Sequence, residues 1–595
     1  MIKSIAELLK IHTGRAFQVL YPDANIQLND ILINETKPDF KGDYTIVLFP
    51  FVKSLKVNPT ALGDALGNYL VKHNDEYCGY ETVAGFLNIT ITDTYWSHYL
   101  NKCDINFLFK NSDSNSKKIM VEYSSPNTNK PLHLGHLRNN FLGVALANVL
   151  KEIGNDVVKS CVVNDRGVHI CKSMIAWQRY GNGATPISTE IKGDHFVGDY
   201  YVKFNDAYKQ EVDALVQAGS SREDAEKEAP IMKATQQMLL DWEAGDAGVM
   251  ELWKEMNGWV YEGFDKTYKD IGSTFDKVYY ESDTYLLGKD LVEEGLQKGV
   301  FFQKDDGSIW IDLTSDGLDE KIVRRRDGTS VYITQDIGLA VEKQKEYQLD
   351  ESIYVVGDEQ NYHFKVLKLI CQKLELAGAD GIYHLSYGMV ELPSGKMKSR
   401  EGTVVDADDL VAEMKNLAQK QTETAGKTEG FTQEELEKLY ETIGMGALKF
   451  YLLRVDPKKK MIFNPEESID LHGFTATFIQ YAYARINSLL TKTKYVLNEI
   501  VIDTDNLLKP EKDLLLIQEQ YQNTLLQAAS EFNPSILCNY SFKLAQQFNT
   551  FFEQCSIVKA ESDSKKLLRQ TLAAHTSNIL KHAMNLLGID LPERM

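Results

Sequence analysis

Two segments far apart in the chain carry side chains suited to phosphate chemistry. The first, at residues 126–140, reads PNTNKPLHLGHLRNN and places His133 and His136 on either side of Gly135. Glycine lets a ligand approach the backbone, the first N–H groups of a helix attract phosphate, and imidazoles can donate hydrogen bonds to phosphate oxygens. Two histidines at the start of a helix are also typical of capping or packing, so this segment alone leaves both interpretations open.

The second segment is cationic. Residues 394–405 read SGKMKSREGTVV, in which Lys396, Lys398 and Arg400 alternate between two glycines. A loop of this kind suits a pyrophosphate leaving group, and it is also typical of a solvated surface. Neither a GxxxxGK[ST] loop nor a GxGxxG turn is present at the turn that holds the histidines. Phosphate would therefore have to be held in a different way.

The elements expected around the histidines are those of a parallel α/β unit. An apolar strand is predicted at 118–125, a long helix at 137–154 and a second strand at 156–165. Strand, loop, helix and strand in succession are typical of nucleotide-binding domains. Further strands are expected around 308–313, 330–334 and 352–357.

The rest of the chain divides into parts by pattern. Residues 1–110 alternate helix and strand, with a helix expected at 60–73 and strands at 45–52 and 85–92; a polar linker follows at 111–118. The pattern predicts a catalytic domain over 111–455 with a helical, acidic insertion at about 200–300, and an almost wholly helical domain over 456–595. The role of the insertion does not follow from the sequence.

Composition narrows the class of protein. The 595 residues are 43% hydrophobic and 25% charged, which is ordinary for globular domains, and the net charge of −20 argues against general phosphate attraction. Nearly all of the acidic excess lies between residues 121 and 450, so both ends are close to neutral. The seven cysteines include no Cys-x-x-Cys pair, which disfavours a disulfide framework or a cysteine-rich zinc site and fits a reducing cytoplasm. No window approaches 18 apolar residues, so we expect a protein without membrane segments.

Together the two chemical segments resemble the signatures of class I aminoacyl-tRNA synthetases. His133-Leu134-Gly135-His136 is similar to their HIGH tetrapeptide, and residues 396–400 are similar to their KMSKS loop. The wider context resembles the arginyl family within that class, in VEYSSPNTNKPLHLGHLR, SVYITQDIG, VVGDEQNYHF, FIQYAYARI and the closing LPERM. The resemblance runs from about residue 40 to the end. It implies a Rossmann-like (HUP-type) parallel-sheet catalytic domain, an N-terminal α+β domain that contacts the tRNA elbow, and a C-terminal all-α anticodon-binding bundle.

The resemblance also implies which residues bind ATP and act on its phosphates. It implies catalytic and ATP-binding roles for Lys130, His133, Gly135, His136, Lys396 and Met397. The second lysine of KMSKS falls on Ser399 here, and members of this family instead tend to have a lysine just before the first signature, which matches Lys130. Whether Lys398 takes part stays open.

Arginine contacts follow from the resemblance in the same way. It assigns them to five positions, each with the expected residue type: Glu122, Asn127, Tyr332, Asp336 and Gln360. A site for a planar cation with five N–H donors needs carboxylates and amide oxygens in a fixed arrangement. Tyr332 and Asp336 are four residues apart and would share one face of a helix. Each residue taken alone is also typical of core hydrogen bonding or helix capping.

RNA contacts are implied at both ends of the chain. The resemblance matches Phe86 and Asn88 in the N-terminal domain, and Tyr481, Ala482, Arg485 and Met595 in the C-terminal domain, to tRNA-binding positions. Aromatic side chains suit stacking on unpaired bases. Phe86 in a core, or Tyr481 and Arg485 in helix packing, are alternatives.

The implied reaction is ligation of arginine to tRNA(Arg). L-Arginine would attack ATP to give arginyl-adenylate and pyrophosphate, and the arginyl group would pass to the 3′-terminal ribose of the tRNA with release of AMP. Mg²⁺ would accompany the phosphates, no tightly bound protein metal is expected, and activation would require bound tRNA. We expect a cytoplasmic monomer that binds neither membrane nor DNA.

Two rival functions remain at this point. Another class I synthetase, for glutamate, glutamine or cysteine, is disfavoured by the carboxylates at Glu122 and Asp336 and by the lack of paired cysteine ligands. A synthetase-like protein that binds tRNA or proteins without charging would not need the full set of histidines, Lys396 and arginine contacts. An aminoacylation panel separates all three.

Overall fold

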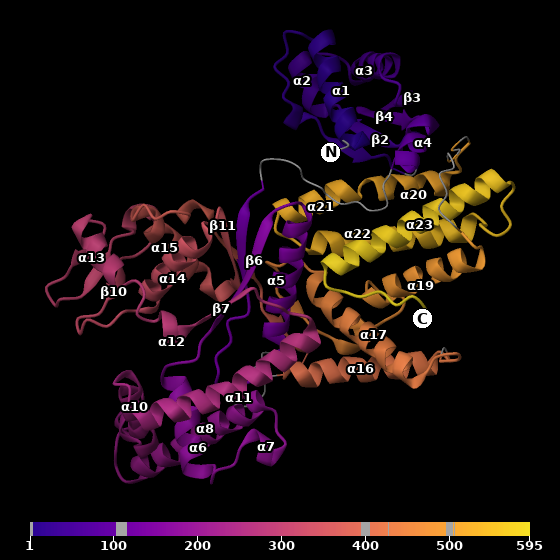
Figure 1. The fold of residues 1–595 in the computed structure, drawn as a ribbon. Helices are drawn as coiled ribbons and strands as arrows, with labels where there is room; N and C mark the ends of the chain where they lie inside the picture. The colour runs from indigo at the N-terminus through magenta and orange to yellow at the C-terminus, as the bar shows by residue number, and fades with distance from the viewer. Residues whose placement is uncertain are drawn as a thin grey trace.

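The computed structural model describes residues 4–37, 39–102, 116–393, 405–426, 428–495, 502, 504 and 506–595. A parallel sheet lies at the centre, with a helical lobe, a small antiparallel lobe, a C-terminal helical bundle and an N-terminal domain around it (Figure 1). The predicted fold class, α/β with an α+β domain before it and helices after it, is confirmed.

The N-terminal domain packs helices against a four-stranded antiparallel sheet in the order β1-β2-β4-β3. Apolar side chains of α1 and α3, spaced at helical period, meet the buried face of the sheet, where Ile46, Leu87 and Ile89 have no exposed surface. Its elements are α1 (Ile5–Leu20), the 3₁₀ helix η1 (Leu28–Asp30), β1 (Ile33–Glu35), β2 (Tyr44–Val47), α2 (Phe49–Leu55), α3 (Pro59–His73), β3 (Tyr77–Val83), β4 (Phe86–Ile91) and α4 (Asp93–Lys102).

The central sheet has five parallel strands in the order β12-β11-β5-β6-β7. The chain runs outward in one direction through β5, β6 and β7 and then returns to add β11 on the other side of β5. The order therefore reverses between β5 and β11, and in such sheets ligands bind outside the carboxyl ends of the strands at the reversal. The strands are β5 (Lys118–Glu122), β6 (Asp156–Val163), β7 (Lys277–Tyr280), β11 (Glu351–Gly357) and β12 (Ile382–Tyr387).

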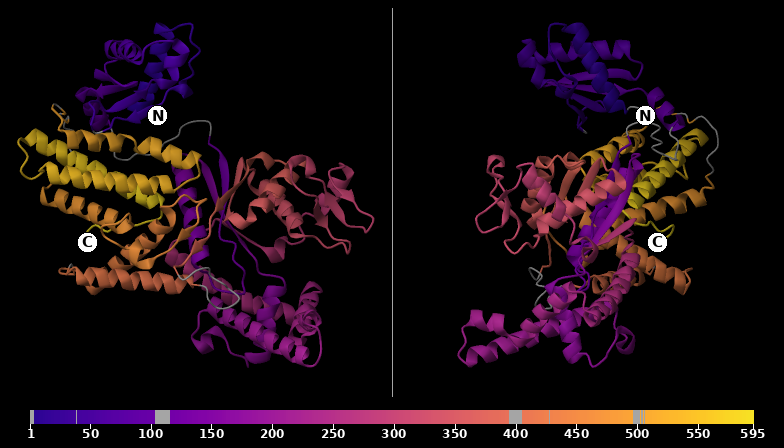
Figure 2. Two further views of the ribbon diagram at one scale, coloured as in Figure 1. Left: turned by 180° about the vertical axis from the view of Figure 1, so that it is seen from behind. Right: turned by 60° about the vertical axis from the view of Figure 1, so that its left-hand side comes forward.

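Helices cover both faces of this sheet. Helix α5 (Leu134–Glu152) and the C-terminal bundle lie on one side, and α14 (Tyr332–Tyr347) and α15 (Asn361–Lys373) lie on the other (Figures 1 and 2). Along β11, Ile353 and Val355 join the core on the side of α5, whereas Tyr354 joins the core on the side of α15. This alternation explains why the central strands read as continuous apolar runs.

The helical lobe is inserted between β6 and β7 and extends away from the sheet, at the bottom of Figure 1. Its helices run from residue 168 to residue 271, so they begin well before residue 200 and end before residue 300. They are α6 (Val168–Tyr180), α7 (Pro186–Thr189), α8 (Gly193–Gln217), α9 (Arg222–Glu228), α10 (Pro230–Glu243) and α11 (Ala247–Ile271).

A small lobe follows β7 and leads into α14. It is built on a three-stranded antiparallel sheet in the order β10-β9-β8. Its elements are α12 (Glu281–Thr284), α13 (Lys289–Gln297), β8 (Phe302–Gln303), β9 (Ile309–Ile311), η2 (Thr314–Asp316) and β10 (Lys321–Arg324). The central domain has four further short elements: η3 (Asp358–Gln360), η4 (Ala379–Gly381) and the parallel pair β13 (Val390–Glu391) and β14 (Met461–Ile462).

The rest of the chain is helical. Helices α19, α22 and α23 pack on one another, and α20 packs on α22 and α23. None of the helices among the described residues combines the length and apolar character needed to cross a bilayer. The elements are α16 (Ala407–Thr424), α17 (Gln433–Leu453), α18 (Pro465–Ser468), α19 (Ala476–Lys492), α20 (Lys509–Glu519), α21 (Tyr521–Ser530), α22 (Ser535–Gln554) and α23 (Asp563–Leu586).

Two predicted strands differ from the structure. The segment 330–334 begins helix α14 at Tyr332, because its apolar residues continue at helical spacing through Ile337. The strand expected at 45–52 ends at Val47, and helix α2 follows with Pro50 near its start, a position where proline is favoured.

Candidate functional site

The two signature histidines form the N-terminal cap of α5. His133 is the N-cap residue, and its Nδ1 accepts a hydrogen bond from the backbone N–H of Gly135 at 3.1 Å. The Nδ1 of His136 accepts from the backbone N–H of His133, also at 3.1 Å. The rings lie 3.9 Å apart between centroids. The capping interpretation is therefore correct, and it leaves the Nε2 atom of each ring for another partner.

The electrostatics of the turn fix the proton positions. Burial, aided by the positive charge of Lys130, lowers the pKa of His133 to about 4. Burial also lowers the pKa of His136, with His133 and Lys130 adding to the effect. Both imidazoles are thus neutral near pH 7. Because Nδ1 accepts a hydrogen bond in each ring, the single proton lies on Nε2, which makes Nε2–H a donor.

Lys130 and Gly135 are the other described residues predicted to bind ATP, and both lie beside the histidines. Burial lowers the pKa of Lys130, since a desolvated ammonium loses its hydration. A Cβ on Gly135 would lie 3.0 Å from Cε1 of His133, so a larger residue would press on the ring. Lys130 and His133 line an open pocket of about 240 Å³ together with residues of α8 and the start of α16.

The cationic segment Lys396 to Arg400, which includes the predicted ATP-binding residues Lys396 and Met397, lies outside the described residues. The chain is described again from Val405, and there it meets the histidine turn. Leu134 N donates to the Val405 carbonyl at 3.1 Å, and Ala407 N donates to the Leu132 carbonyl at 3.0 Å. Residues 405–407 are thus paired in antiparallel fashion with residues 132–134.

Glu122, predicted to contact arginine, ends the central strand β5. It is 8% exposed, and its Oε2 forms an ion pair with the ammonium of Lys343 from α14, which is 1% exposed. The Lys343 ammonium also lies 4.7 Å from the ring centroid of Tyr354. The carboxylate is therefore shared with an internal cation through its Oε2 atom.

The other four predicted arginine contacts lie at the same edge of the sheet. Tyr332 and Asp336 share a face of α14, as predicted from their spacing. Tyr332 is 74% exposed. Oδ2 of Asp336 lies 2.6 Å from Nε2 of His363. Gln360 is exposed directly after β11. Asn127 is exposed in the loop after β5 and forms a bridge with Asn164 after β6.

Glu281 is a residue that sequence reasoning missed. It follows β7 directly, at the carboxyl edge where the predicted arginine contacts lie. Burial raises the pKa of Glu281 to about 7, with Asp165 and Asp336 raising it further against the opposing effect of Arg166. Its position after a parallel strand was the available signal. The edge thus includes the carboxylates of Glu122, Asp336 and Glu281 among its acidic side chains.

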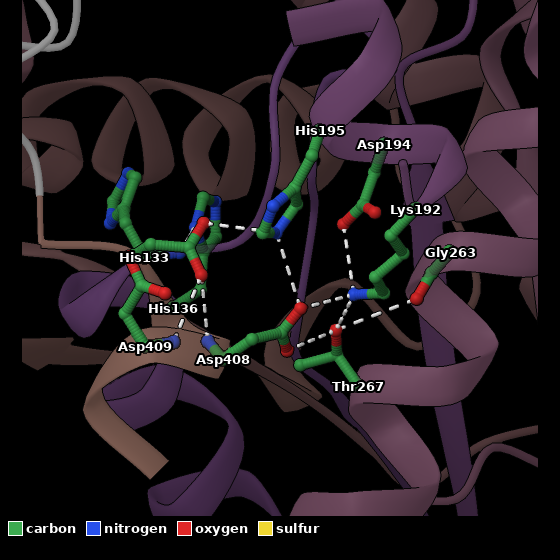
Figure 3. A network of polar contacts seen from close by, with 10 residues as sticks. His133, His136, Lys192, Asp194, His195, Gly263, Thr267, Asp408 and Asp409 are labelled. Carbon is green, nitrogen blue, oxygen red and sulfur yellow. Dashed lines mark hydrogen bonds and ion pairs between the residues drawn. The ribbon is translucent and has the colours of Figure 1, made fainter. Parts of the chain in front are cut away.

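A second missed group joins the helical lobe to the histidine turn (Figure 3). Nζ of Lys192 lies 2.5 Å from Oδ2 of Asp408 and 3.2 Å from Oδ2 of Asp194. Nε2 of His195 lies 3.2 Å from Oδ2 of both Asp406 and Asp408. Asp194, His195 and Asp408 are residues of metal-binding type and lie close together, but the ammonium of Lys192 already places a positive charge among them.

The predicted RNA contacts in the N-terminal domain differ in exposure. Phe86 is 38% exposed and stacks edge-on against Phe49, which is 52% exposed, with centroids 5.2 Å apart. Asn88 is 3% exposed, and its Oδ1 accepts a hydrogen bond from Thr45 at 2.7 Å. Phe86 is therefore accessible at the surface, whereas Asn88 is held inside the sheet.

The predicted contacts in the bundle show the same contrast. On α19, the guanidinium of Arg485 lies 4.8 Å from the ring centroid of Tyr481, and both side chains are half-buried. Ala482 has no exposed surface. Met595 is partly buried against the core. Tyr481 and Arg485 thus offer a cation–π pair at the surface, while Ala482 packs inside the bundle.

Comparison with known families assigns both halves of the chain. A family model described as "tRNA synthetases class I (R), catalytic domain" matches residues 104–464. A second, described as "DALR anticodon binding domain", matches residues 479–595. The first contains the histidine turn and all the predicted arginine contacts; the second contains the pair on α19.

Individual relatives are similar over their whole length. A protein of Flavobacterium psychrophilum named arginine–tRNA ligase is 50% identical, with 100% of both chains covered. One of the same name from Bacteroides fragilis is 49% identical, with 96% of each covered. Among solved structures, an arginyl-tRNA synthetase of Thermus thermophilus shares the fold with a TM-score of 0.79 and 22% identity, over 99% of this chain and 100% of that one.

Proposed function

Because this chain belongs to the arginyl-tRNA synthetase family of class I tRNA synthetases, we propose that it is an arginine–tRNA ligase. It activates L-arginine with ATP to arginyl-adenylate and transfers the arginyl group to the 3′-terminal ribose of tRNA(Arg), with release of AMP and pyrophosphate. The observation that carries this proposal is the placement of a carboxylate-rich edge and a neutral histidine turn at the same reversal point of the sheet.

The carboxylates select the guanidinium of arginine. Asp336 and Oε1 of Glu122 accept from its N–H donors, and Tyr332, Gln360 and Asn127 complete the polar lining. Glu281, whose pKa is raised to about 7, ionises fully when a cation arrives, because an opposite charge favours the carboxylate. A substrate without this charge would leave the partly buried carboxyl groups of Asp336 and Glu281 without a cationic ligand, which disfavours its binding.

The histidine turn acts on the phosphates. The Nε2–H groups of His133 and His136 donate to phosphate oxygens as charge moves onto the leaving pyrophosphate, and Lys130 adds a positive charge. Lys396 contributes from the cationic segment, with Met397 beside it. No covalent intermediate with the protein is needed: the arginine carboxylate attacks the α-phosphorus, and placement supplies most of the rate.

Magnesium, in this proposal, arrives on the phosphates of ATP. Two carboxylates at the start of α16 already have partners: Oδ1 of Asp406 accepts from the backbone N–H of Asp408, and Asp408 binds Lys192. These residues therefore do not form a free oxygen cage of the kind a resident Mg²⁺ would need.

The tRNA contacts both ends of the chain. Phe86 with Phe49 stacks at the elbow, with Asn88 supporting the sheet beneath, and Tyr481 with Arg485 meets the anticodon loop, with Ala482 packed below and Met595 near the chain end. The enzyme works as a monomer in the cytoplasm, which fits the free thiols of its described cysteines.

An aminoacylation panel tests the proposal. The purified chain is incubated with ATP, Mg²⁺, a tRNA(Arg) transcript and each of the twenty amino acids. Only arginine should be attached, and arginine-dependent pyrophosphate exchange should require the tRNA. Attachment of a different amino acid, or none, would overturn the assignment.

A further inference from the structure

We propose that Lys192 is a positioning residue for adenylate formation: through Asp408 it holds the start of α16, which in turn holds the histidine turn. The inference rests on the proposed function, and it gives the helical lobe a role in the reaction. Three steps lead from the lobe to the imidazoles.

The first step is a close contact between the two long helices of the lobe. Gly193 begins α8 where a Cβ would lie 1.9 Å from the carbonyl oxygen of Trp259 on α11, and a Cβ on Gly263 would lie 2.4 Å from Oδ1 of Asp194. Only glycine allows this approach at either position. The packing fixes Lys192, at the N-cap of α8, beside Thr267 of α11.

The second step is ionic. The Lys192 ammonium donates to Thr267 Oγ1 at 2.5 Å and to Oδ2 of Asp408 at 2.5 Å, while Thr267 donates to Oδ1 of Asp408 at 2.8 Å. Both carboxylate oxygens of Asp408 are therefore held by the lobe. Asp194, which has no exposed surface, pairs with the same ammonium. Lys192 is thus the cation shared by two buried or half-buried carboxylates from different parts of the chain.

The third step leads from α16 to the imidazoles. Asp406, two residues before Asp408, caps α16 by accepting from the backbone N–H groups of Asp408 and Asp409. The backbone around Asp406 pairs with that around His133. Helix α8 also touches the turn from the other side, since a Cβ on Gly198 would lie 2.9 Å from Pro131. The histidine turn therefore contacts both α8 and the start of α16, and this arrangement is called the clamp below. Figure 3 shows the Lys192–Asp408 contact beside the two histidines.

The position of the histidine turn should matter more for rate than for substrate affinity. Its Nε2–H groups must meet oxygens whose charge grows in the transition state, and a displacement of about 1 Å can cost roughly a hundredfold in rate. The proposed arginine contacts lie on β5, on α14 and in the segments that follow β5 and β11, whereas the partners of Lys192 are Asp194, Thr267 and Asp408. Loss of the clamp should therefore lower kcat while leaving the KM for arginine close to that of the wild type.

The test compares three variants of the full chain with the wild type in tRNA-dependent pyrophosphate exchange. Lys192→Met removes the shared cation. Asp408→Asn removes only the carboxylate charge on α16 and keeps the Lys192–Asp194 pair. Lys192→Arg keeps a positive charge at position 192. Lys415→Met is the matched control, because Lys415 lies further along α16 and pairs with Glu437 and Glu441 of α17 at 2.8 Å. Thermal unfolding of each protein is measured in the same buffer.

We expect kcat to fall about ten- to a hundredfold in Lys192→Met and in Asp408→Asn, with partial recovery in Lys192→Arg and no change in Lys415→Met. A folded Asp408→Asn protein with wild-type kcat, an effect confined to KM, or an equal loss in Lys415→Met would overturn the proposal. Wild-type charging with arginine separates the two proposals: an inactive wild type contradicts the function, whereas an active wild type with unaffected variants contradicts only the role of Lys192.

Discussion

The Nδ1 atoms of His133 and His136 cap the start of α5 by accepting from the backbone N–H groups of Gly135 and His133. The capping function considered from the sequence is therefore confirmed, and the proposed donor role of the Nε2 atoms is compatible with it. The sequence could predict the turn because its residues are adjacent in the chain. It could not predict the Lys192–Asp408 pair, because nothing local links residues more than two hundred positions apart.

His133→Asn separates the two uses of the ring. Asparagine can cap a helix, but it cannot place an N–H where Nε2 lies. We expect α5 to form normally and kcat for pyrophosphate exchange to fall about 10²–10³-fold, as for loss of one transition-state donor. Because the pKa of His133 is lowered to about 4, the wild-type ring stays neutral, and its titration should not shape the rate between pH 6 and 9. Circular dichroism controls for folding; an unchanged kcat would contradict the donor role.

Asp336→Asn tests the carboxylate edge. The substitution keeps the size of the side chain and its contact with His363 but removes the charge that pairs with the guanidinium. The KM for arginine should rise on the order of tenfold to a hundredfold, while the KM for ATP stays unchanged. Steady-state kinetics with each substrate in turn distinguishes the two. Tyr347→Phe, at the other end of α14, is a control that should leave both constants unchanged.

Lys343→Met tests the internal partner of Glu122. Removing the ammonium leaves a buried carboxylate unpaired, which destabilises proteins by about 3–5 kcal/mol. Adding Glu122→Gln to Lys343→Met removes the unpaired charge and should recover much of that loss. A denaturant titration of the wild type, both single variants and the double variant measures the coupling; purely additive effects would show that the pair does not interact.

At the scale of elements, local pattern predicted β5, α5, β6 and β11 of the central domain, and the strand that it predicted wrongly has a local cause. The stretch at 330–334 alternates apolar and polar residues, so it was predicted as a strand, yet Ile333 and Ile337 continue the apolar face of a helix that buries them against the small lobe. A parallel sheet was expected from the strand–loop–helix–strand pattern, but the order of its strands was not predicted. The clamp between α8 and α16 was not predicted either, because it depends on how the lobe packs.

Arg138 connects helix α5 by hydrogen bonds to the segments around the short pair β13 and β14. Its guanidinium has no exposed surface and donates to the carbonyls of Gly388, Asp456, Pro457 and Lys459. Arg138→Met would leave these acceptors without their donor, so we expect a loss of about 3 kcal/mol or more in the free energy of unfolding. Arg138→Lys, with a single ammonium, should recover only part of it because it cannot reproduce the planar fork. Equal stability of both variants and the wild type would contradict this.

At the scale of the whole molecule, the two near-neutral ends of the chain pack on each other. The N-terminal domain contacts α20 of the bundle and the residues before it: Lys512 of α20 pairs with Asp43 at 2.9 Å, and Ser97 donates to the carbonyl of Ile502, which precedes α20. The acidic excess predicted between residues 121 and 450 therefore belongs to the central domain and its lobes. Both regions proposed to contact tRNA form one continuous unit (Figure 1), without the net negative charge that would repel a polyanion.

Glu519 makes this interface sensitive to pH. Its Oε1 accepts from the backbone N–H of Ile5 at 2.6 Å and from the Tyr95 hydroxyl at 3.2 Å, and its buried Oε2 has no partner among the described residues. Burial raises the pKa of Glu519 to about 7 from an ordinary 4.5. The folded protein therefore keeps the proton while the unfolded chain releases it as the pH rises through 4.5, so the interface loses stability between about pH 4.5 and 7, in total on the order of 3 kcal/mol.

Glu519→Gln removes this dependence, because glutamine keeps the accepting oxygen and is neutral at every pH. The variant should melt at the same temperature as the wild type near pH 5 and a few degrees above it at pH 8. At pH 8 the wild-type carboxyl must either ionise while buried or stay protonated above its pKa, and both cost free energy. Scanning calorimetry at both pH values measures the difference. A variant that is less stable than the wild type at pH 8 would show that the carboxylate is charged and paired in the folded protein, which the contacts of Glu519 with Ile5 and Tyr95 do not provide.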